Sequence, residues 1–215
     1  MSTLSTSDGG RQGPKDSPGR DERPRYRRDV RPEERRTDRL VLSPVTIADL
    51  DAFVALEAAL RSRENPPREA PDPADSARYL SRFVQVWDRG ELGYWTIRHQ
   101  DRVAGFGGVA PTLWRLRRCW NLYYRVAPDF WGRGIATETA REAVTAAGAR
   151  HPDWPVVVET DPANTPAIRV AARVGLTRLP GEAGDRYAVL LLDPGSPPEP
   201  TAERDQPRGR NGPRG

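Results

Sequence analysis

The middle of the chain alternates between hydrophobic and polar residues in patterns that predict a mixed α/β domain. Alternation with a period of two indicates a strand, and apolar residues three or four positions apart indicate a helix. On this basis strands are predicted at 39–45, 93–99, 102–112, 117–128, 155–160 and 186–194. Helices are predicted at 46–62, 74–90, 132–150 and 164–176. This order predicts a central mixed sheet, antiparallel in its first half, with a helical crossover near its centre and about four flanking helices.

The predicted helices differ in the faces that they offer for burial. The first should bury the residues with helical spacing, Leu50, Phe53, Val54 and Leu56. The second should bury Tyr79, Phe83, Val86 and Trp87. The third carries a flat face of small residues that can lie close to a sheet, Ala136, Ala140, Ala143 and Ala147. Thr46 is a predicted N-cap, and Gly90 and Gly175 are predicted helix ends.

Composition separates this middle region from two polar ends. The chain has 215 residues, of which 36% are hydrophobic and 30% charged, with 22 Pro and 19 Gly, which is too polar a mixture for one uniformly packed globule. Residues 1–37 and 195–215 offer almost nothing to bury and are predicted to be disordered, which leaves 38–194 as the folded domain. The arginines of the first tail could form a nucleic-acid-binding arm. Acidic residues alternate with them, however, and the net charge is only +4, so a solvated tail is favoured.

Cysteine and histidine are too few for a disulfide or a metal site. Cys119 is the single cysteine, and His99 and His151 lie far apart without metal-ligand spacing, so no metal is expected. The first residues lack the pattern of a signal peptide, and no apolar run approaches the length of a membrane span. These features predict a soluble cytoplasmic protein without a membrane partner.

The segment WGRGIATE, residues 131–138, places two glycines and an arginine at the start of the third predicted helix. The first amides of a helix have no internal partner and, with the helix dipole, attract an anion. Glycines let the anion approach the backbone, and Arg133 is favourable there only once the anion is bound. The spacing matches neither the Walker A loop nor the dinucleotide-binding fingerprint. The segment alone is equally compatible with glycines that only pack the start of a helix.

The same segment resembles the signature motif of the GCN5-related N-acetyltransferase (GNAT) superfamily, Gln/Arg-x-x-Gly-x-Gly/Ala. Gly134 and Ala136 match its small positions, and Trp131 stands where Gln or Arg is usual, as in the branch of ribosomal-protein alanine acetyltransferases. A second match, NTPAIRVAARVGL, is similar to that branch's Asn-x-x-Ser-Ile-Arg-Val-x-x-x-x-Gly-Phe, with Ala167 in place of the Ser. A third, TDRLVLSPVTIADLDAF, is similar to its opening Thr-x-Arg-Leu-x-Leu-Arg-Pro. The matches occur in order and together span about 37–194.

This resemblance implies a coenzyme site. In the family two central parallel strands splay apart and the coenzyme enters the gap, and here the strands would be 121–126 and 156–159. The implied co-substrate is acetyl-CoA, whose pantetheine would pair with the backbone of Tyr124, Arg125 and Val126. Its pyrophosphate would lie against Trp131, Gly132, Arg133, Gly134, Ile135, Ala136 and Thr137. Asn164 would contact the coenzyme from the opposite side, or serve as an ordinary helix N-cap, or both.

The implied reaction is direct transfer of the acetyl group from the thioester to an amine. A backbone amide around 124–126 would stabilise the tetrahedral oxyanion. Many relatives carry a Tyr as general acid seven residues after this Asn, and here Ala171 stands there, so Tyr124, Tyr123 or water is left for that role. Glu159 is the candidate base if it faces the gap among apolar neighbours that raise its pKa, and is otherwise a solvated carboxylate.

The sequence leaves the acceptor and two other functions open. The acceptor site would be shaped by the first two helices and their loop, which mixes basic residues (Arg61, Arg63, Arg68) with acidic ones (Glu64, Glu69, Asp72, Asp75). This mixture selects neither an acidic substrate nor a cationic amine, so protein N-termini, small amines and aminosugar drugs all stay possible. Because the Tyr and Ser of the family are absent, a non-catalytic acyl-CoA sensor is an alternative. A nucleic-acid-binding protein acting through the N-terminal arm is the weakest alternative.

Overall fold

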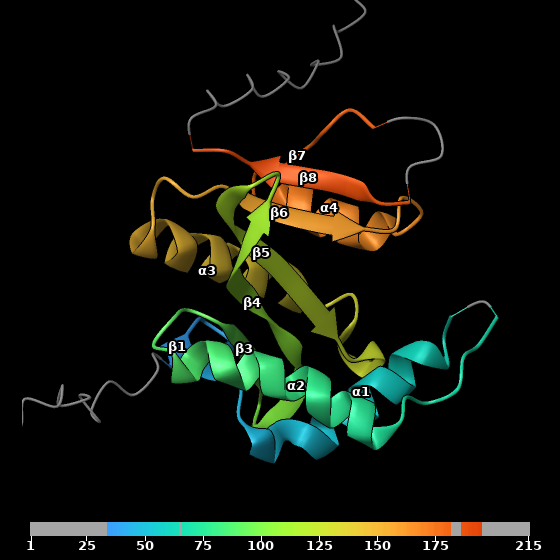
Figure 1. Cartoon of the computed structure of the whole chain (residues 1–215). Helices are drawn as coiled ribbons and strands as arrows, with labels where there is room; N and C mark the ends of the chain where they lie inside the picture. The colour runs from blue at the N-terminus through green and yellow to red at the C-terminus, as the bar shows by residue number, and fades with distance from the viewer. Residues whose placement is uncertain (1–33, 65, 182–185, 195–215) are drawn as a thin grey trace, which may run out of the picture. The chain divides into compact units, whose positions relative to one another are not determined.

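The computed structural model describes residues 34–64, 66–181 and 186–194, where one eight-stranded sheet is flanked by four α-helices (Figure 1). The strand order is β1-β2-β3-β4-β5-β6-β8-β7. Neighbouring strands are antiparallel except β5 and β6, which are parallel. This confirms the predicted mixed sheet with an antiparallel first half.

The elements follow the predicted order, with some changed boundaries. The strands are β1 (Arg35–Arg36), β2 (Leu40–Pro44), β3 (Tyr94–His99), β4 (Arg102–Trp114), β5 (Arg117–Val126), β6 (Val156–Thr160), β7 (Thr177–Arg178) and β8 (Ala188–Leu192). The α-helices are α1 (Leu50–Arg61), α2 (Pro73–Asp88), α3 (Ile135–Arg150) and α4 (Thr165–Arg173), and η1 (Ile47–Asp49) and η2 (Pro128–Phe130) are short 3-10 helices. β1 falls inside the tail predicted to be disordered, so the ordered chain begins before residue 38. The remaining tail predictions, for 1–33 and 195–215, lie outside the described residues.

Short-range hydrogen bonds explain where the first helices begin. The amide and the hydroxyl of Thr46 donate to Asp49 Oδ2 at 2.9 and 3.1 Å, which closes the turn of η1. Thr46 therefore caps η1, and α1 begins only at Leu50. Asp72 Oδ1 accepts from the amide of Ala74 at 2.7 Å and caps α2, a role for which Asp is well suited.

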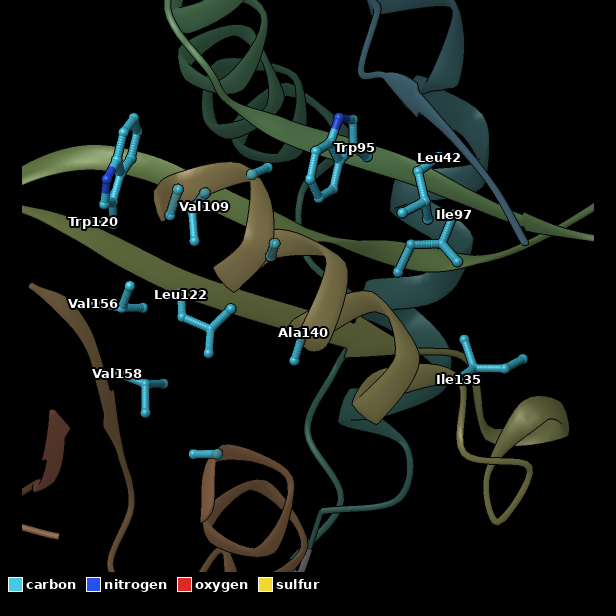
Figure 2. Packing of buried hydrophobic residues seen from close by; sticks show 14 of the residues in the cluster. Leu42, Trp95, Ile97, Val109, Trp120, Leu122, Ile135, Ala140, Val156 and Val158 are labelled. Carbon is cyan, nitrogen blue, oxygen red and sulfur yellow. The ribbon is translucent and has the colours of Figure 1, made fainter. Parts of the chain in front are cut away.

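The larger apolar core lies between the sheet and α3. Figure 2 shows side chains of the sheet gathered around this helix, among them Leu42, Trp95, Ile97, Val109, Trp120 and Leu122. The helix contributes the predicted flat face, through the buried residues Ala140, Ala143, Ala146 and Ala147, while Ala136 is half-buried. A Cβ at Gly107 of β4 would lie 3.2 Å from Thr139 Cγ2, so the glycine allows α3 to approach the strand closely.

A second core lies on the opposite face of the sheet, under α1 and α2. It consists of Val45, Phe53, Leu56, Leu80, Phe83, Tyr94, Phe106 and Ala110. The predicted stripes are confirmed at Phe53, Leu56 and Phe83. Tyr79, predicted to be buried, is 43% exposed, because α2 turns Leu80 toward the sheet and leaves the Tyr79 ring against the edge of Phe83, with 5.0 Å between ring centroids.

Candidate active site

The parallel strands β5 and β6 pair over two residues and then separate. Trp120 pairs with Val156 and Asn121 with Val157. Beyond this point β5 continues to Val126 beside β4, whereas β6 continues to Thr160 beside β8. From residue 122 onward, the edge of β5 that faces β6 has no strand partner among the described residues. This is the splayed pair expected for 121–126 and 156–159.

Beside this opening, a glycine-containing loop leads into α3. Gly132 and Gly134 have φ values of +74° and +76°, a backbone conformation that favours glycine. A Cβ at Gly132 would have nothing within 4 Å, and one at Gly134 would lie 3.6 Å from Arg39 Nη2. α3 begins at Ile135 rather than at the predicted residue 132, and Gly134 is its N-cap residue.

The backbone amides of this loop are available to a ligand. In the described part of the chain, no hydrogen bond is donated by the amides of residues 132–137. The amide of Glu138 is the first to donate within the helix, to the carbonyl of Gly134 at 3.0 Å. A run of free amides at the positive end of a helix is suited to hold a phosphate.

Arg39 fastens this loop to the edge of the sheet. Its Nη1 donates to the carbonyl of Arg133 at 3.0 Å, and its Nε donates to Glu138 Oε2 at 2.9 Å. Thr37 Oγ1 donates to the other carboxylate oxygen of Glu138 at 2.5 Å. Partial burial acts to raise the pKa of Glu138, but these donors and the Arg39 charge lower it overall. Sequence reasoning found the Thr-x-Arg-Leu match but missed that its arginine holds the loop.

The side chains of the loop rest on the protein instead of on the expected anion position. Trp131 Nε1 donates to the carbonyl of Val126 at 2.7 Å, so a carbonyl expected to pair with pantetheine already has a partner. Trp131 is 51% exposed, and the Arg63 guanidinium lies 5.7 Å from the centroid of its ring. The Arg133 guanidinium lies 5.5 Å from the centroid of Phe130.

Alternate residues of β5 face opposite sides of the sheet, and Tyr124 faces α3 and α4. Its side chain packs against the larger core, and its hydroxyl donates to the carbonyl of Ala167 in the first turn of α4 at 2.7 Å. Burial raises the pKa of Tyr124 above its ordinary value. The hydroxyl thus reaches the position where the related branch carries its Ser.

Arg125 faces the other side, toward α1, where it meets a buried carboxylate. Its Nη1 donates to both carboxylate oxygens of Glu57, at 2.5 and 2.6 Å. The Glu57 side chain is 10% exposed and that of Arg125 is 45% exposed. Sequence reasoning missed Glu57, although its spacing of four from Phe53 and three from Leu60 places it on the apolar stripe of α1.

Two tyrosines lie close together on this face. The hydroxyl of Tyr94 accepts from Asn121 Nδ2 at 2.6 Å, whereas the buried hydroxyl of Tyr123 has no hydrogen-bond partner among the described residues. Their ring centroids are 5.0 Å apart. Burial raises the pKa of Tyr94 to about 12 and also raises that of Tyr123, which the nearby charge of Arg125 acts to lower.

The two predicted catalytic residues lie on different faces of the sheet. Paired residues of adjacent strands share a face, so Val157 lies on the face of Asn121, and Glu159, two residues further, follows it there. Glu159 is exposed and, if the register is continued, lies level with Tyr123, on the face opposite Tyr124. The structure therefore does not bring Glu159 and Tyr124 together on one face.

Asn164 forms the N-cap of α4. Its Oδ1 accepts from the amide of Ala167 at 3.2 Å, and its Nδ2 donates to Thr160 Oγ1 at 3.2 Å. The side chain is exposed, so these bonds leave it open to solvent beside the gap. The capping alternative is thus confirmed, while a contact with coenzyme stays a prediction.

The described residues contain no helix that is long and apolar enough to cross a membrane. They also contain no group of three or more His, Cys, Asp or Glu side chains that could hold a metal ion.

Comparison with known proteins agrees with this architecture. Residues 39–177 match the family model of the acetyltransferase (GNAT) domain. An acetyltransferase from Agrobacterium tumefaciens str. C58 is 21% identical with a TM-score of 0.63, covering 85% of this chain and 99% of its own. RimL, a ribosomal L7/L12 α-N-protein acetyltransferase in complex with coenzyme A, is 18% identical with a TM-score of 0.57, covering 73% and 95%. The microcin C7 self-immunity acetyltransferase MccE, in complex with acetyl-CoA and AMP, is 13% identical with a TM-score of 0.56, covering 73% and 93%. At these identities the likeness is one of fold.

Proposed function

Because this chain belongs to the GNAT acetyltransferase domain family, we propose that it transfers an acetyl group from acetyl-CoA directly to an amine. The observation that carries this function is the gap between β5 and β6, which ends at the free amides of residues 132–137. An unpaired strand edge suits an extended amide-containing chain, and the amides suit a pyrophosphate. Acetyl-CoA carries both groups in one molecule.

The residues of the loop fit this co-substrate. Gly132 and Gly134 leave the amides uncovered, and Arg39 Nη2, which pairs with Glu138, lies 3.6 Å from the place where a Gly134 side chain would begin. RimL and MccE bind coenzyme A and acetyl-CoA respectively, on the same fold. The coenzyme supplies the activated acetyl group. The chain's own groups orient it, accept a proton from the amine and donate a hydrogen bond to the thiolate.

Each proposed catalytic group acts on a different side of the reacting carbon. Glu159 faces the side of α1 and α2, where it can take the proton that the amine must lose before attack. The amine nitrogen then bonds to the acetyl carbon, the carbon–sulfur bond breaks, and the thiolate leaves on the other side. The nitrogen gives up its second proton to water as the amide forms, and the thiolate takes up a proton from water. A backbone amide of 124–126 would stabilise the oxyanion between them.

Tyr124 stands on the leaving-group side and is suited to donate a hydrogen bond to the thiolate. Burial raises its pKa, so the hydroxyl keeps its proton at neutral pH. Complete proton transfer would be uphill, because a thiol has an ordinary pKa of about 8.5. This role requires the hydroxyl to exchange the carbonyl of Ala167 for the sulfur.

An acyl-CoA sensor without catalysis is the second candidate function. It is favoured by Ala167 and Ala171, which place no hydroxyl at either position where relatives carry Ser or Tyr. Ala171 is fully buried in the larger core, so it offers no substitute group.

Thermal unfolding with acetyl-CoA, and with ATP and NAD as controls, tests the coenzyme site. At about 100 times its Kd a ligand adds about 2.7 kcal/mol, which for a domain of this size raises the Tm by about 5–10 °C. A rise with acetyl-CoA alone is expected, followed by release of free thiol when amines are added. A rise without thiol release on a broad amine panel would favour the sensor, and no rise would overturn the coenzyme assignment.

A further inference from the structure

Resting on the proposed function, we propose that the acceptor amine carries a carboxylate close to its nitrogen and that Arg125, held by Glu57, binds this carboxylate. Arg125 lies on β5 at the mouth of the gap, on the face of α1 and α2. This is the face on which an amine can approach the coenzyme from the side of Glu159. The acceptor site would thus recognise both ends of an amino acid-like group.

Among the described residues, one nitrogen of the Arg125 guanidinium is hydrogen-bonded and the other two are not. A single nitrogen, Nη1, takes both oxygens of Glu57, and neither Nη2 nor Nε has a hydrogen-bond partner among the described residues. Glu57 is buried while the Arg125 side chain is nearly half exposed, so part of this side chain is open to solvent. A planar guanidinium fixed in this way is preorganised to bind a carboxylate through two parallel hydrogen bonds.

A second arginine on the same face shows what a purely structural arrangement looks like. Arg98 of β3 donates through Nη2 to Asp49 Oδ1 and through Nη1 to Ser43 Oγ, both at 3.0 Å. Its side chain is 35% exposed and that of Asp49 is 8% exposed, close to the values for the other pair. Both terminal nitrogens of Arg98 are therefore hydrogen-bonded to the protein, whereas one terminal nitrogen of Arg125 has no partner among the described residues.

The hydroxyl of Tyr123 adds a second unused group at this place. It is buried without a hydrogen-bond partner among the described residues, and the charge of Arg125 acts on it. Several other buried polar groups also lack a partner in this part of the chain, among them Thr96 Oγ1 and Trp95 Nε1. What links Tyr123 to the acceptor is its position two residues before Arg125 on the same face of β5. A polar ligand bound there would supply the missing partner.

The α1–α2 loop holds most of its acidic side chains in bonds to the protein. Glu64 pairs with Arg68 at 3.2 Å, Asp75 pairs with Arg78, and Asp72 caps α2. Arg63, in contrast, has no acidic partner among the described residues and lies over the ring of Trp131 at the phosphate loop. Three of the four acids of this loop are therefore engaged, whereas the side chains of Glu69 and Arg63 have no partner of opposite charge among the described residues.

The test compares amines that differ only in the carboxylate. α-Amino acids are assayed against their C-amides, and dipeptides beginning with Asp or Glu against those beginning with Asn or Gln, by thiol release from acetyl-CoA. We expect the wild type to prefer the carboxylate forms by about 10- to 100-fold in kcat/KM, the range for hydrogen bonds to a charged group. In Arg125→Gln the ratio of acid to amide should fall to about one, and Arg125→Lys should keep a part of it.

Arg98→Gln is the matched control, since it breaks an ion pair of similar burial away from the gap, and the preference for carboxylates should survive it. Glu57→Gln should raise KM for the acid forms, because the guanidinium loses its anchor. A wild type that acetylates neutral or cationic amines as well as or better than the acids, or that acetylates no carboxylate-bearing amine, would overturn the proposal. So would a preference that persists in Arg125→Gln. The wild type and each variant are also unfolded with acetyl-CoA. If the coenzyme assignment is wrong, the wild type shows no rise in Tm, which distinguishes that failure from a failure of the acceptor proposal.

Discussion

Strands β3 and β5 each present a tyrosine and an arginine to the face of α1 and α2, and they use them differently. On β3, Tyr94 accepts a hydrogen bond from Asn121, and Arg98 binds Asp49 and Ser43. On β5, Tyr123 has no hydrogen-bond partner among the described residues, and Arg125 spends one nitrogen on Glu57. The residue types are the same and their burial is similar, so composition does not explain the difference.

Position in the sheet does explain it. β3 lies between β2 and β4 and is paired along both edges, whereas β5 loses its partner β6 after Asn121. The groups named on β3 are satisfied by neighbouring protein, while the hydroxyl of Tyr123 and part of the Arg125 guanidinium, beside the gap, have no hydrogen-bond partner among the described residues. In this sheet, unused hydrogen-bonding capacity therefore occurs at the strand opening, on the same kinds of side chain that are more completely paired on β3.

The amides of residues 132–137 form a run of unused donors in the described part of the chain, and Gly134→Trp should remove the coenzyme binding proposed for them. The indole would cover the amides, and the Kd for acetyl-CoA should rise by at least about 100-fold, equal to about 2.7 kcal/mol. Isothermal titration of the folded variant measures the change.

Gly90→Trp provides a matched control for backbone strain. Gly90 has a φ of +72°, and a Cβ at this position would have nothing within 4 Å, so it matches Gly134 in conformation but follows α2. Both substitutions should cost about 1–2 kcal/mol in unfolding free energy, since an L side chain is disfavoured at positive φ. Unchanged acetyl-CoA affinity in Gly134→Trp, or an equal loss in Gly90→Trp, would contradict the assignment of the loop.

Most of the fold is predictable from the sequence, because long elements bury periodic apolar residues. The alternation in 93–99 and the alanines of 132–150 report directly on the faces that pack. β1 and β7 escape prediction because each has two residues, Arg35–Arg36 and Thr177–Arg178, and no apolar signal. They exist because β2 and β8 offer open edges, which is a tertiary condition.

The sequence predicts the site only where the groups involved are neighbours in the chain. The glycines of 132–134 predict an anion-binding loop because the amides, the helix start and the backbone conformation lie within a few residues. The bond between Arg125 and Glu57 joins residues 68 positions apart, and Arg39 meets Glu138 across 99 positions. No rule of sequence spacing predicts such pairs. A glutamate on the apolar stripe of a helix, such as Glu57, does indicate that it has a cationic partner, because burying an unpaired charge is costly.

Tyr94 and Tyr123 are both buried, and the dependence of the unfolding free energy on alkaline pH should show it. An ordinary tyrosine ionises near pH 10, whereas burial raises the pKa of Tyr94 to about 12 and also that of Tyr123. Above pH 10 the unfolded chain loses these protons and the folded chain keeps them, so stability is complete below pH 10 and falls as the pH rises toward 12. The expected loss is about 1.4 kcal/mol per pH unit for each such tyrosine. Urea unfolding across this range, with phenolate absorbance of the native protein, measures it, and a flat stability curve would contradict the burial.

Substitution by phenylalanine should separate the two tyrosines again, with the smallest effect. Tyr94→Phe leaves the Asn121 amide without its acceptor and should cost about 1 kcal/mol in unfolding free energy. Tyr123→Phe breaks no hydrogen bond to a described residue and removes a buried hydroxyl, so its unfolding free energy should be unchanged or higher by up to about 1 kcal/mol. Urea denaturation without ligand compares the two variants at neutral pH. An equal loss in both would mean that the Tyr123 hydroxyl already has a partner in the folded protein, and the contrast between β3 and β5 would then rest on the arginines alone.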